Sequence, residues 1–381
     1  MAMAREIGVL PRVDLQRLLD ALSAKGYRIV GPTVRDGAVV WETVRSVSDL
    51  PVGWRDHQEP GRYRLEQTGS QEVFGVVHGP QSLKQFVFAP REPLLQIERT
   101  KDGFVTRPTL PQSEKVAIIG ARACDLAGLA VQDRIFLKDF HSDPYYAARR
   151  EGLFLVAVNC TRALNTCFCA SMETGPRAKH GFDLALSELD DQLLIEAGSE
   201  AGRDLLSNLC LSRGSEQLSA EAATRVDACA QSQVRRLDHS RLPQALYDAH
   251  EHPRWDEVAS RCLACTNCTM VCPTCFCHTV EETPDLSYQH TTHARLWDSC
   301  FTQEHGYIHG KNMRPTIKDR YRMWLTHKLA SWIDQFGASG CVGCGRCITW
   351  CPVGIDLTEE LPALLSPGIQ PSIVRQRVDG M

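Results

Sequence analysis

Apolar residues recur along the chain with several spacings, and each spacing predicts a different kind of element. Leucines three or four positions apart over residues 14–25 predict an amphipathic helix. Apolar and β-branched residues flank Asp36-Gly37 on both sides, which is the pattern of a β-hairpin. The short apolar runs 116–121 and 153–158 do not alternate with polar residues, as is typical of strands buried on both faces.

A helical segment, RACDLAGLAVQDRIF, connects the two apolar runs, and this order indicates a right-handed parallel crossover. Two further apolar stretches around Asp190-Asp191 predict another strand pair, and residues 200–250 are mostly polar and helical. We therefore expect residues 1–245 to form an α/β domain with a partly parallel sheet.

The pattern changes after residue 245, where strand signals become rare. One strong helix is predicted with Pro315 at its first position, Gly337 as its stop and one stripe of side chains that we interpret as core packing. The stripe consists of Ile317, Tyr321, Trp324, Leu325, Lys328, Trp332, Ile333 and Phe336. We therefore expect an all-α, helical domain over residues 246–362 and a loose C-terminal tail over 363–381.

Charge and composition narrow the function classes. The 381 residues contain 42 Lys plus Arg against 46 Asp plus Glu, and the net charge of −4 gives no reason to expect nucleic acid or an anionic membrane as a partner. No run reaches the roughly 18 apolar residues of a membrane span. The first residues show neither a secretory nor a twin-arginine signal, so we expect a cytoplasmic protein.

Cysteine is unusually abundant for such a chain, with 17 residues, most of them in the segments 262–277 and 341–351. In a reducing cytosol, so many thiols favour metal or cluster ligands over disulfides. No G-x-G-x-x-G follows a strand and no P-loop is present, so we expect no nucleotide site on this chain.

Two cysteine runs have the spacing C-x2-C-x2-C-x3-C-P of bacterial ferredoxins. The first three cysteines of a run wrap one 4Fe–4S cube, and the fourth, beyond its reach, ligates the cube of the other run. We therefore assign two crossed ligand sets: Cys262, Cys265, Cys268 and Cys351 for cluster 1, and Cys341, Cys344, Cys347 and Cys272 for cluster 2. This crossing brings the two clusters close together, as rapid electron transfer requires.

Two other interpretations of these runs fit the spacing less well. Zinc sites favour pairs of C-x2-C knuckles rather than the duplicated ferredoxin spacing. Cys268, Cys272 and Cys275 have the spacing of a radical-enzyme triad, but two of them are already assigned to the cubes. The 68 residues between Cys272 and Cys341 favour a helical ferredoxin architecture, with backbone N–H groups near the glycines of the second run stabilising anionic clusters.

A third group of cysteines follows the predicted strands 116–121 and 153–158, and it consists of Cys124, Cys160, Cys167 and Cys169. Carboxyl ends of parallel strands meet helix N-termini at one edge of a sheet, where anions bind. We therefore expect a third 4Fe–4S cluster at this edge. A four-thiolate zinc site and ordinary buried or reactive thiols are the alternatives, because a C-x-C pair strains a cube.

Five cysteines remain outside these sets. Cys275 and Cys277 lie in a TCFC segment that repeats the TCFC of the third group. They are interpreted as buried thiols beside a cluster, with a redox pair or alternative ligands as the other readings. Cys210, Cys229 and Cys300 are interpreted as non-ligands.

Several segments resemble a known family: ITWCPVGID, CPTCFC, IGARACDL and VNCTRALNTCFCASMETGP. They are similar to the β subunit of soluble NAD(P)-linked sulfhydrogenases and, equally, to the A subunit of anaerobic sulfite reductase, which form one family of 4Fe–4S dicluster proteins. The resemblance spans about residues 80–362. It implies a third cluster on Cys124, Cys160, Cys167 and Cys169, and electron relay between a flavin subunit that binds NAD(P) and a catalytic unit.

We therefore expect a non-catalytic iron–sulfur subunit of a cytoplasmic oxidoreductase, with three 4Fe–4S clusters. Its expected partners are a flavin/NAD(P) subunit and the small and large subunits of a nickel–iron hydrogenase. An anaerobic sulfite reductase with a sirohaem subunit is the alternative within the family. Sulfur or polysulfide reduction by Cys275 and Cys277, and a non-redox zinc scaffold, are the alternatives of other classes. No catalytic residue is assigned.

Overall fold

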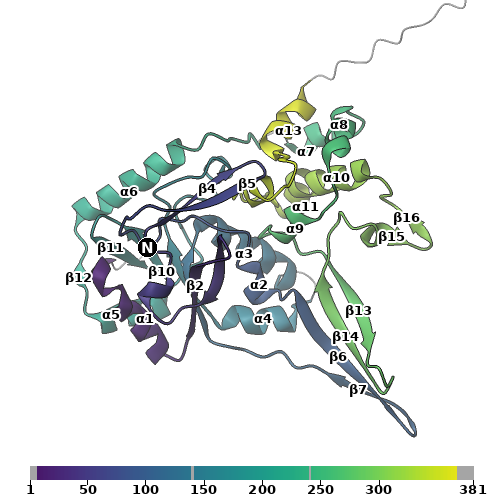
Figure 1. Cartoon of the computed structure of the whole chain (residues 1–381), viewed down its shortest axis with the longest axis horizontal. Helices are drawn as coiled ribbons and strands as arrows, with labels where there is room; N and C mark the ends of the chain where they lie inside the picture. The colour runs from purple at the N-terminus through teal and green to yellow at the C-terminus, as the bar shows by residue number, and fades with distance from the viewer. Residues whose placement is uncertain (1–6, 139–140, 240–241, 367–381) are drawn as a thin grey trace, which may run out of the picture.

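The structure is a computed structural model that describes residues 7–138, 141–239 and 242–366, and it shows a body of sheet and helices with a projecting β-arm (Figure 1). The predicted tail 363–381 starts inside a helix, α13 (Leu357–Leu365), and its residues 367–381 lie outside the described part. No helix in the described ranges is long and apolar enough to cross a membrane.

An eight-stranded mixed sheet forms the centre of the body, in the order β12-β1-β11-β10-β9-β8-β2-β3. The pairs β10/β9, β9/β8 and β8/β2 are parallel and the outer pairs are antiparallel, which confirms the expected α/β region with a partly parallel sheet. Its strands are β1 (Ile7–Pro11), β2 (Arg28–Arg35), β3 (Ala38–Thr43), β8 (Val116–Ala121), β9 (Leu153–Val158), β10 (Leu184–Glu188), β11 (Gln192–Ala197) and β12 (Ser212–Arg213).

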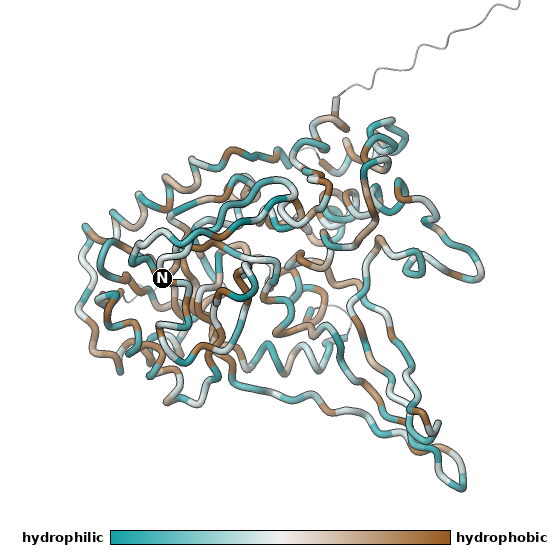
Figure 2. Tube along the Cα trace, in the orientation of Figure 1, coloured by the Kyte–Doolittle hydropathy of each residue, from teal (hydrophilic) through white to brown (hydrophobic). Residues whose placement is uncertain are grey.

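Helices cover both faces of this sheet. The leucines of α1 (Leu15–Ala24) and α5 (Glu200–Leu209) pack on one face. On the other face lie α2 (Lys84–Val87), α3 (Ala123–Phe136) and α4 (Pro144–Glu151). Every residue of β8 is buried and β9 is buried after its first residue, which explains why neither run alternates. Figure 2 shows these central strands largely in brown.

The predicted crossover is confirmed: β8 leads through α3 and α4 to the parallel strand β9. The predicted hairpins are also present, because β2 pairs with β3 around Asp36-Gly37 and β10 pairs with β11 around Asp190-Asp191. As a result, the segments that follow β8 and β9 start from the same edge of the sheet.

The region after residue 245 is not all-α, contrary to expectation. β13 (His278–Pro284) and β14 (His290–Trp297) form a hairpin, and β14 pairs with β6 (Arg91–Thr100), which in turn pairs with β7 (Gly103–Pro108). This antiparallel sheet is the arm in Figure 1. Most residues of β13 and all of β7 are exposed, so no apolar alternation marks them in the sequence (Figure 2).

The arm joins strands from both predicted domains, because β6 precedes residue 245 and β14 follows it. The domain boundary at residues 245/246 therefore runs through a shared sheet, and it stays a prediction. Two small hairpins complete the strands: β4 (Trp54–Glu59) with β5 (Arg62–Gln67), and β15 (Tyr307–Ile308) with β16 (Lys311–Asn312).

Helices dominate the rest of the C-terminal region and share a core built on Trp255, Tyr321 and Trp324. The strong predicted helix is α10 (Ile317–Thr326), a π-helical turn η4 (His327–Ser331) and α11 (Trp332–Phe336). It begins at Ile317, capped by Thr316, rather than at Pro315, and it ends at Gly337 as predicted. The other helices are α6 (Glu216–Gln231), α7 (Leu242–Asp248), α8 (Arg254–Arg261), α9 (Asn267–Met270), α12 (Arg346–Thr349) and α13.

Candidate metal centre

The two ferredoxin-type runs adopt the same backbone conformation. In the first run Ala264 and Thr266 have positive φ angles of 50° and 68°, and in the second run Gly343 and Gly345 have φ angles of 63° and 76°. A short helix follows each loop, α9 in the first run and α12 in the second. Left-handed conformations are costly for non-glycine residues, so the first run keeps this loop despite strain.

Backbone N–H groups in these loops donate hydrogen bonds to cysteine sulfurs. Ala264 N donates to Cys262 Sγ at 3.4 Å, and Gly343 N donates to Cys341 Sγ at 3.5 Å. The N–H donor expected near the glycines of the second run is therefore present at Gly343. Such bonds favour the thiolate form of a sulfur and lower the charge that a cluster imposes on its surroundings.

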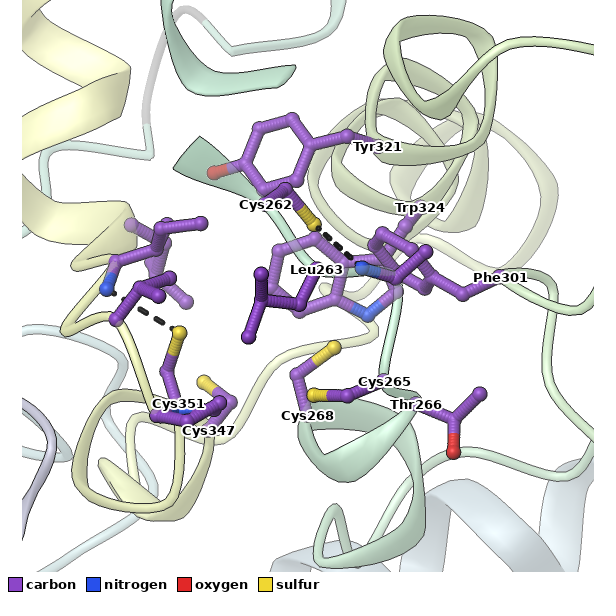
Figure 3. A pocket seen from close by; sticks show the side chains of 15 residues that line it. Cys262, Leu263, Cys265, Thr266, Cys268, Phe301, Tyr321, Trp324, Cys347 and Cys351 are labelled. Atoms are coloured by element: carbon purple, nitrogen blue, oxygen red, sulfur yellow. Dashed lines mark hydrogen bonds between the residues drawn. The ribbon is translucent and has the colours of Figure 1, made fainter. Parts of the chain in front are cut away.

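One pocket brings together the cysteines assigned to cluster 1 (Figure 3). Cys262, Cys265 and Cys268 line it from the first run, and Cys351 reaches it from the second. Ile355 N donates to Cys351 Sγ at 3.3 Å. Cys347, assigned to cluster 2, lines the same pocket, so the two groups are contiguous.

Two aromatic side chains from one helix form part of the wall of this pocket. Tyr321 and Trp324 belong to α10 and line the pocket. Within the described part of the chain, the Tyr321 hydroxyl and Trp324 Nε1 are buried without a hydrogen-bond partner. A buried donor is rarely left unpaired, so these groups fit a bound acceptor such as the sulfides and thiolates of a cube.

The second run gathers around Cys272 of the first. The thiols of Cys341, Cys344 and Cys347 each interact electrostatically with the thiol of Cys272. The crossed arrangement that the spacing predicts is thus compatible with the positions of all eight cysteines, while the ligand sets themselves stay a prediction.

Lys328 is a site residue that the sequence did not reveal. Its ammonium group is buried and donates to Cys272 Sγ at 3.3 Å and to Thr274 Oγ1 at 2.7 Å. Burial opposes its charge, but the surrounding thiols, Cys272 first, raise the pKa of Lys328 well above its usual value. Lys328 therefore places a positive charge beside the second group, where it balances thiolates.

The third group forms at the edge of the central sheet. Cys124, Cys160, Cys167 and Cys169 all line one cavity and all are buried, as their positions after β8 and β9 predict. Gln233 Nε2 donates to Cys169 Sγ at 3.2 Å. Cys229, interpreted from the sequence as a non-ligand, lines the same cavity.

The third group lies directly against the second run. Phe168 N donates to Gly343 O at 2.9 Å, and a Cβ on Gly343 would meet Cys169 N at 2.7 Å. Thr174 Oγ1 donates to Val342 O at 2.7 Å. Cys344 itself lines the cavity of the third group, so the three cysteine groups form a continuous series.

Two buried arginines supply positive charge at this junction. Arg346 is fully buried and pairs with buried Asp125 at 2.8 Å, beside Cys344 and Cys124. Arg122 is buried next to Cys160, where it donates to the carbonyls of Val77 at 3.2 Å and of neighbouring residues. Both cations favour an anionic group at the cysteines, and neither is recognisable from sequence spacing.

Several of the buried thiols are held in the protonated form by their surroundings. Burial raises the pKa of Cys341 and of Cys169 to about 12. A coordinated metal deprotonates a thiol outright, so such positions suit metal ligands rather than free reactive thiols. Among the described residues, no cluster of three or more His, Cys, Asp or Glu side chains is placed to hold a single metal ion.

Cys275 and Cys277, interpreted from the sequence as buried thiols beside a cluster, have different hydrogen-bond partners. Cys275 hydrogen-bonds to Cys272, whereas Cys277 hydrogen-bonds to Cys300 and to His305. His305 Nδ1 lies 2.6 Å from Asp298 Oδ2. The hydrogen bond from Cys300 and the neighbouring His305 lower the pKa of Cys277 to about 4.

Ferredoxin-type cysteine runs with donors to their sulfurs define a class, the 4Fe–4S dicluster proteins, and the 4Fe-4S dicluster domain family matches residues 261–355. Over 304 residues the chain is 32% identical to sulfhydrogenase 2 subunit beta of Pyrococcus furiosus. The aligned residues cover 78% of this chain and 88% of that relative. The chain belongs to the family of sulfhydrogenase β subunits, and the resemblance of its motifs is confirmed. No solved structure matches the chain.

Proposed function

We propose that this protein is the electron-transfer subunit of a hydrogenase complex and that it carries three 4Fe–4S clusters. The observation that carries the proposal is the continuous series of cysteine groups, from the pocket of Cys262 through Cys347 and Cys344 to the cavity of Cys160. When bound, the clusters supply one-electron redox chemistry. Because the three groups are contiguous, an electron would travel only a short distance between one cluster and the next.

The chain's own residues set the conditions for that transfer. Crossed ligands bring the first two groups together, and we assign Cys262, Cys265, Cys268 and Cys351 to cluster 1 and Cys341, Cys344, Cys347 and Cys272 to cluster 2. Buried cations and N–H donors stabilise the negative charge of a cluster, which increases with each electron that the cluster accepts. We assign no catalytic residue to this chain and propose that the catalytic chemistry takes place on partner subunits.

The partners follow from the family by analogy. The relative's name describes a β subunit of a sulfhydrogenase. We propose that this chain works in the cytoplasm between a flavin subunit binding NAD(P) and nickel–iron hydrogenase subunits. Purification of the native complex through a tagged chain tests this setting. Recovery of flavin and nickel–iron subunits supports it, whereas recovery of a sirohaem subunit identifies a sulfite reductase instead.

Iron analysis of anaerobically purified protein tests the number of clusters. We expect about twelve irons per chain. About eight would remove the third cluster, and four or fewer would end the proposal. Cys351→Ala and Cys272→Ala form a matched pair, because each should disturb a different cluster in the electron paramagnetic resonance (EPR) spectrum. Cys210→Ala, at an exposed thiol outside the three groups, is the control and should keep all the iron.

A second candidate function is thiol chemistry at Cys277, favoured by its contacts with Cys300 and His305. A thiolate beside an imidazole is the form that attacks sulfur compounds. Cys277→Ser should then abolish reduction of polysulfide by the complex and spare hydrogen-linked turnover of NAD(P). The matched variant Cys275→Ser removes a neighbouring thiol that contacts Cys272 instead. Unchanged polysulfide reduction in Cys277→Ser would dispose of this function.

A further inference from the structure

The third cavity holds more cysteines than one cube needs. A 4Fe–4S cube takes four thiolates, one for each iron. Five cysteines besides Cys344 line the cavity: Cys124, Cys160, Cys167, Cys169 and Cys229. If a third cluster is bound there, as the proposed function requires, one of these five thiols is left over.

Cys229 lies inside the group and not at its margin. It is on the last turns of α6, is only 2% exposed, and packs with Cys160, Cys167 and Leu164 in one buried cluster of side chains. Its thiol interacts electrostatically with those of Cys160 and Cys169. Its sequence position gave no sign of this, because α6 lies far along the chain from the strands β8 and β9.

The segment that follows Cys229 is fastened to the loop that carries the other thiols. Gln233 Oε1 accepts a hydrogen bond from Ala170 N at 3.0 Å, and Gln233 Nε2 donates to Cys169 Sγ at 3.2 Å. Ser232 Oγ donates to Cys229 O at 2.9 Å, which ties the end of α6. The loop and the end of α6 therefore present their sulfurs to the same space.

Cys124 belongs to a different buried cluster of side chains, which it shares with Cys344 of the second run. This cluster also contains Cys169, Val342 and Trp332. The thiol of Cys124 interacts electrostatically most strongly with Asp125 and Arg346, and then with Cys344 and Cys169. Cys124 thus shares its surroundings with the second run and with Cys169, whereas Cys160, Cys167 and Cys229 share a separate buried cluster.

We propose that Cys229 is a ligand of the third iron–sulfur cluster, together with Cys160, Cys167 and Cys169, and that Cys124 is the spare thiol. The inference rests on the proposed function for the presence of a third cluster, and it revises the ligand set that the family resemblance implied. Gln233 then acts as a positioning residue that donates to one of the four ligands. Cys124 then remains a buried thiol in one cluster with Cys169 and Cys344.

The matched variants Cys229→Ala and Cys124→Ala test this assignment in the full chain, because each removes one buried thiol from the same cavity. Iron and sulfide per chain are measured after anaerobic purification, with EPR spectra of the reduced protein. We expect about twelve irons in the unmodified chain, about eight in Cys229→Ala and about twelve in Cys124→Ala. The lost EPR signal in Cys229→Ala should be that of one cluster only.

The iron contents of the variants distinguish an error in the ligand assignment from the absence of a third cluster. Full iron in Cys229→Ala, or loss of four irons from Cys124→Ala, overturns the assignment while leaving a third cluster in place. About eight irons in the unmodified chain overturns the third cluster itself and the inference with it. Should Cys229→Ala bind no iron at all, Cys229→Ser decides, since its oxygen can replace the sulfur. We expect it to alter the signal of one cluster, and a spectrum identical to that of the unmodified chain overturns the assignment.

Discussion

Lys328 brings a positive charge into a part of the molecule where thiols, not carboxylates, surround it. Lys328→Met keeps the length and the packing of the side chain but removes the donors to Cys272 and Thr274. A hydrogen bond to a charged group contributes about 1.5–3 kcal/mol. If that energy favours the reduced cluster, its loss lowers the reduction potential of one cluster by about 60–130 mV.

Redox titration followed by EPR measures this shift. Lys318→Met is the matched control, because Lys318 lies on the same helix and pairs with Asp256 at the surface. Lys328→Arg should leave the reduction potential close to that of the unmodified protein, since the variant keeps the positive charge. An unchanged potential in Lys328→Met would mean that the ammonium group serves packing alone.

Cys277 should react as a thiolate over a wide range of pH. Its pKa of about 4 lies below that of an ordinary thiol, so the thiolate is the main form at every pH from about 6 to 8. Its alkylation rate by iodoacetamide, read by mass spectrometry, should be nearly flat over this range. The rate for N-acetylcysteine rises about tenfold per unit in the lower part of it. Parallel curves for the two thiols would contradict the prediction.

The sequence revealed the site residues that follow a recognisable local spacing. It missed the residues that reach the site only when distant segments pack together in the fold. The eight cysteines of the two runs are recognisable because the loop that wraps a cube repeats every three residues. Lys328 is buried, as its place in the predicted core stripe indicates, but the stripe gives no sign that its ammonium group reaches Cys272. Cys229 and Gln233 reach their site only through the packing of α6.

At the scale of elements, the close approach of the second run to the third group depends on a glycine. Gly343→Ala puts a Cβ within 2.7 Å of the backbone of Phe168 and Cys169 and also forces a left-handed conformation. The left-handed conformation alone costs about 1–2 kcal/mol. Thermal unfolding of the loaded protein should show a larger loss than that, together with loss of iron.

Gly310→Ala separates the two causes. Gly310 also has positive φ, at 80°, but a Cβ there meets nothing within 4 Å. This variant should lose only the conformational part and keep its iron. Equal destabilisation of the two variants would show that the contact between the second run and the Phe168 loop contributes little.

Strands and helices differed in how well their sequences predicted them. Two kinds of local pattern led to correct predictions. Continuous apolar residues marked the buried strands β8 and β9, and the turn residues Asp36-Gly37 marked the hairpin of β2 and β3. β13 and β14 were missed, because β14 is stabilised by pairing with β6, far away in the sequence, and β13 pairs only with β14 and exposes most of its side chains. An edge that pairs through its backbone leaves little trace in residue type.

At the scale of the whole molecule, the two main cores depend differently on the cysteines. The core between α1, α5 and the central sheet contains no cysteine among its described residues. The core around Trp255 and Trp324 packs directly against Cys262, Cys268, Cys341, Cys347 and Cys351. Metal ligands hold such segments together, so binding and folding are coupled on that side of the molecule.

Removal of the iron should therefore loosen the C-terminal core first. After chelation under anaerobic conditions, hydrogen exchange should speed up in α10 while β8 and β9 keep their protection, because their core does not need the metal. Mass spectrometry of peptides from both regions measures this, with the loaded protein as the reference. Equal loss of protection in the two regions would mean that the shared sheet of β6 and β14 couples them into one cooperative unit.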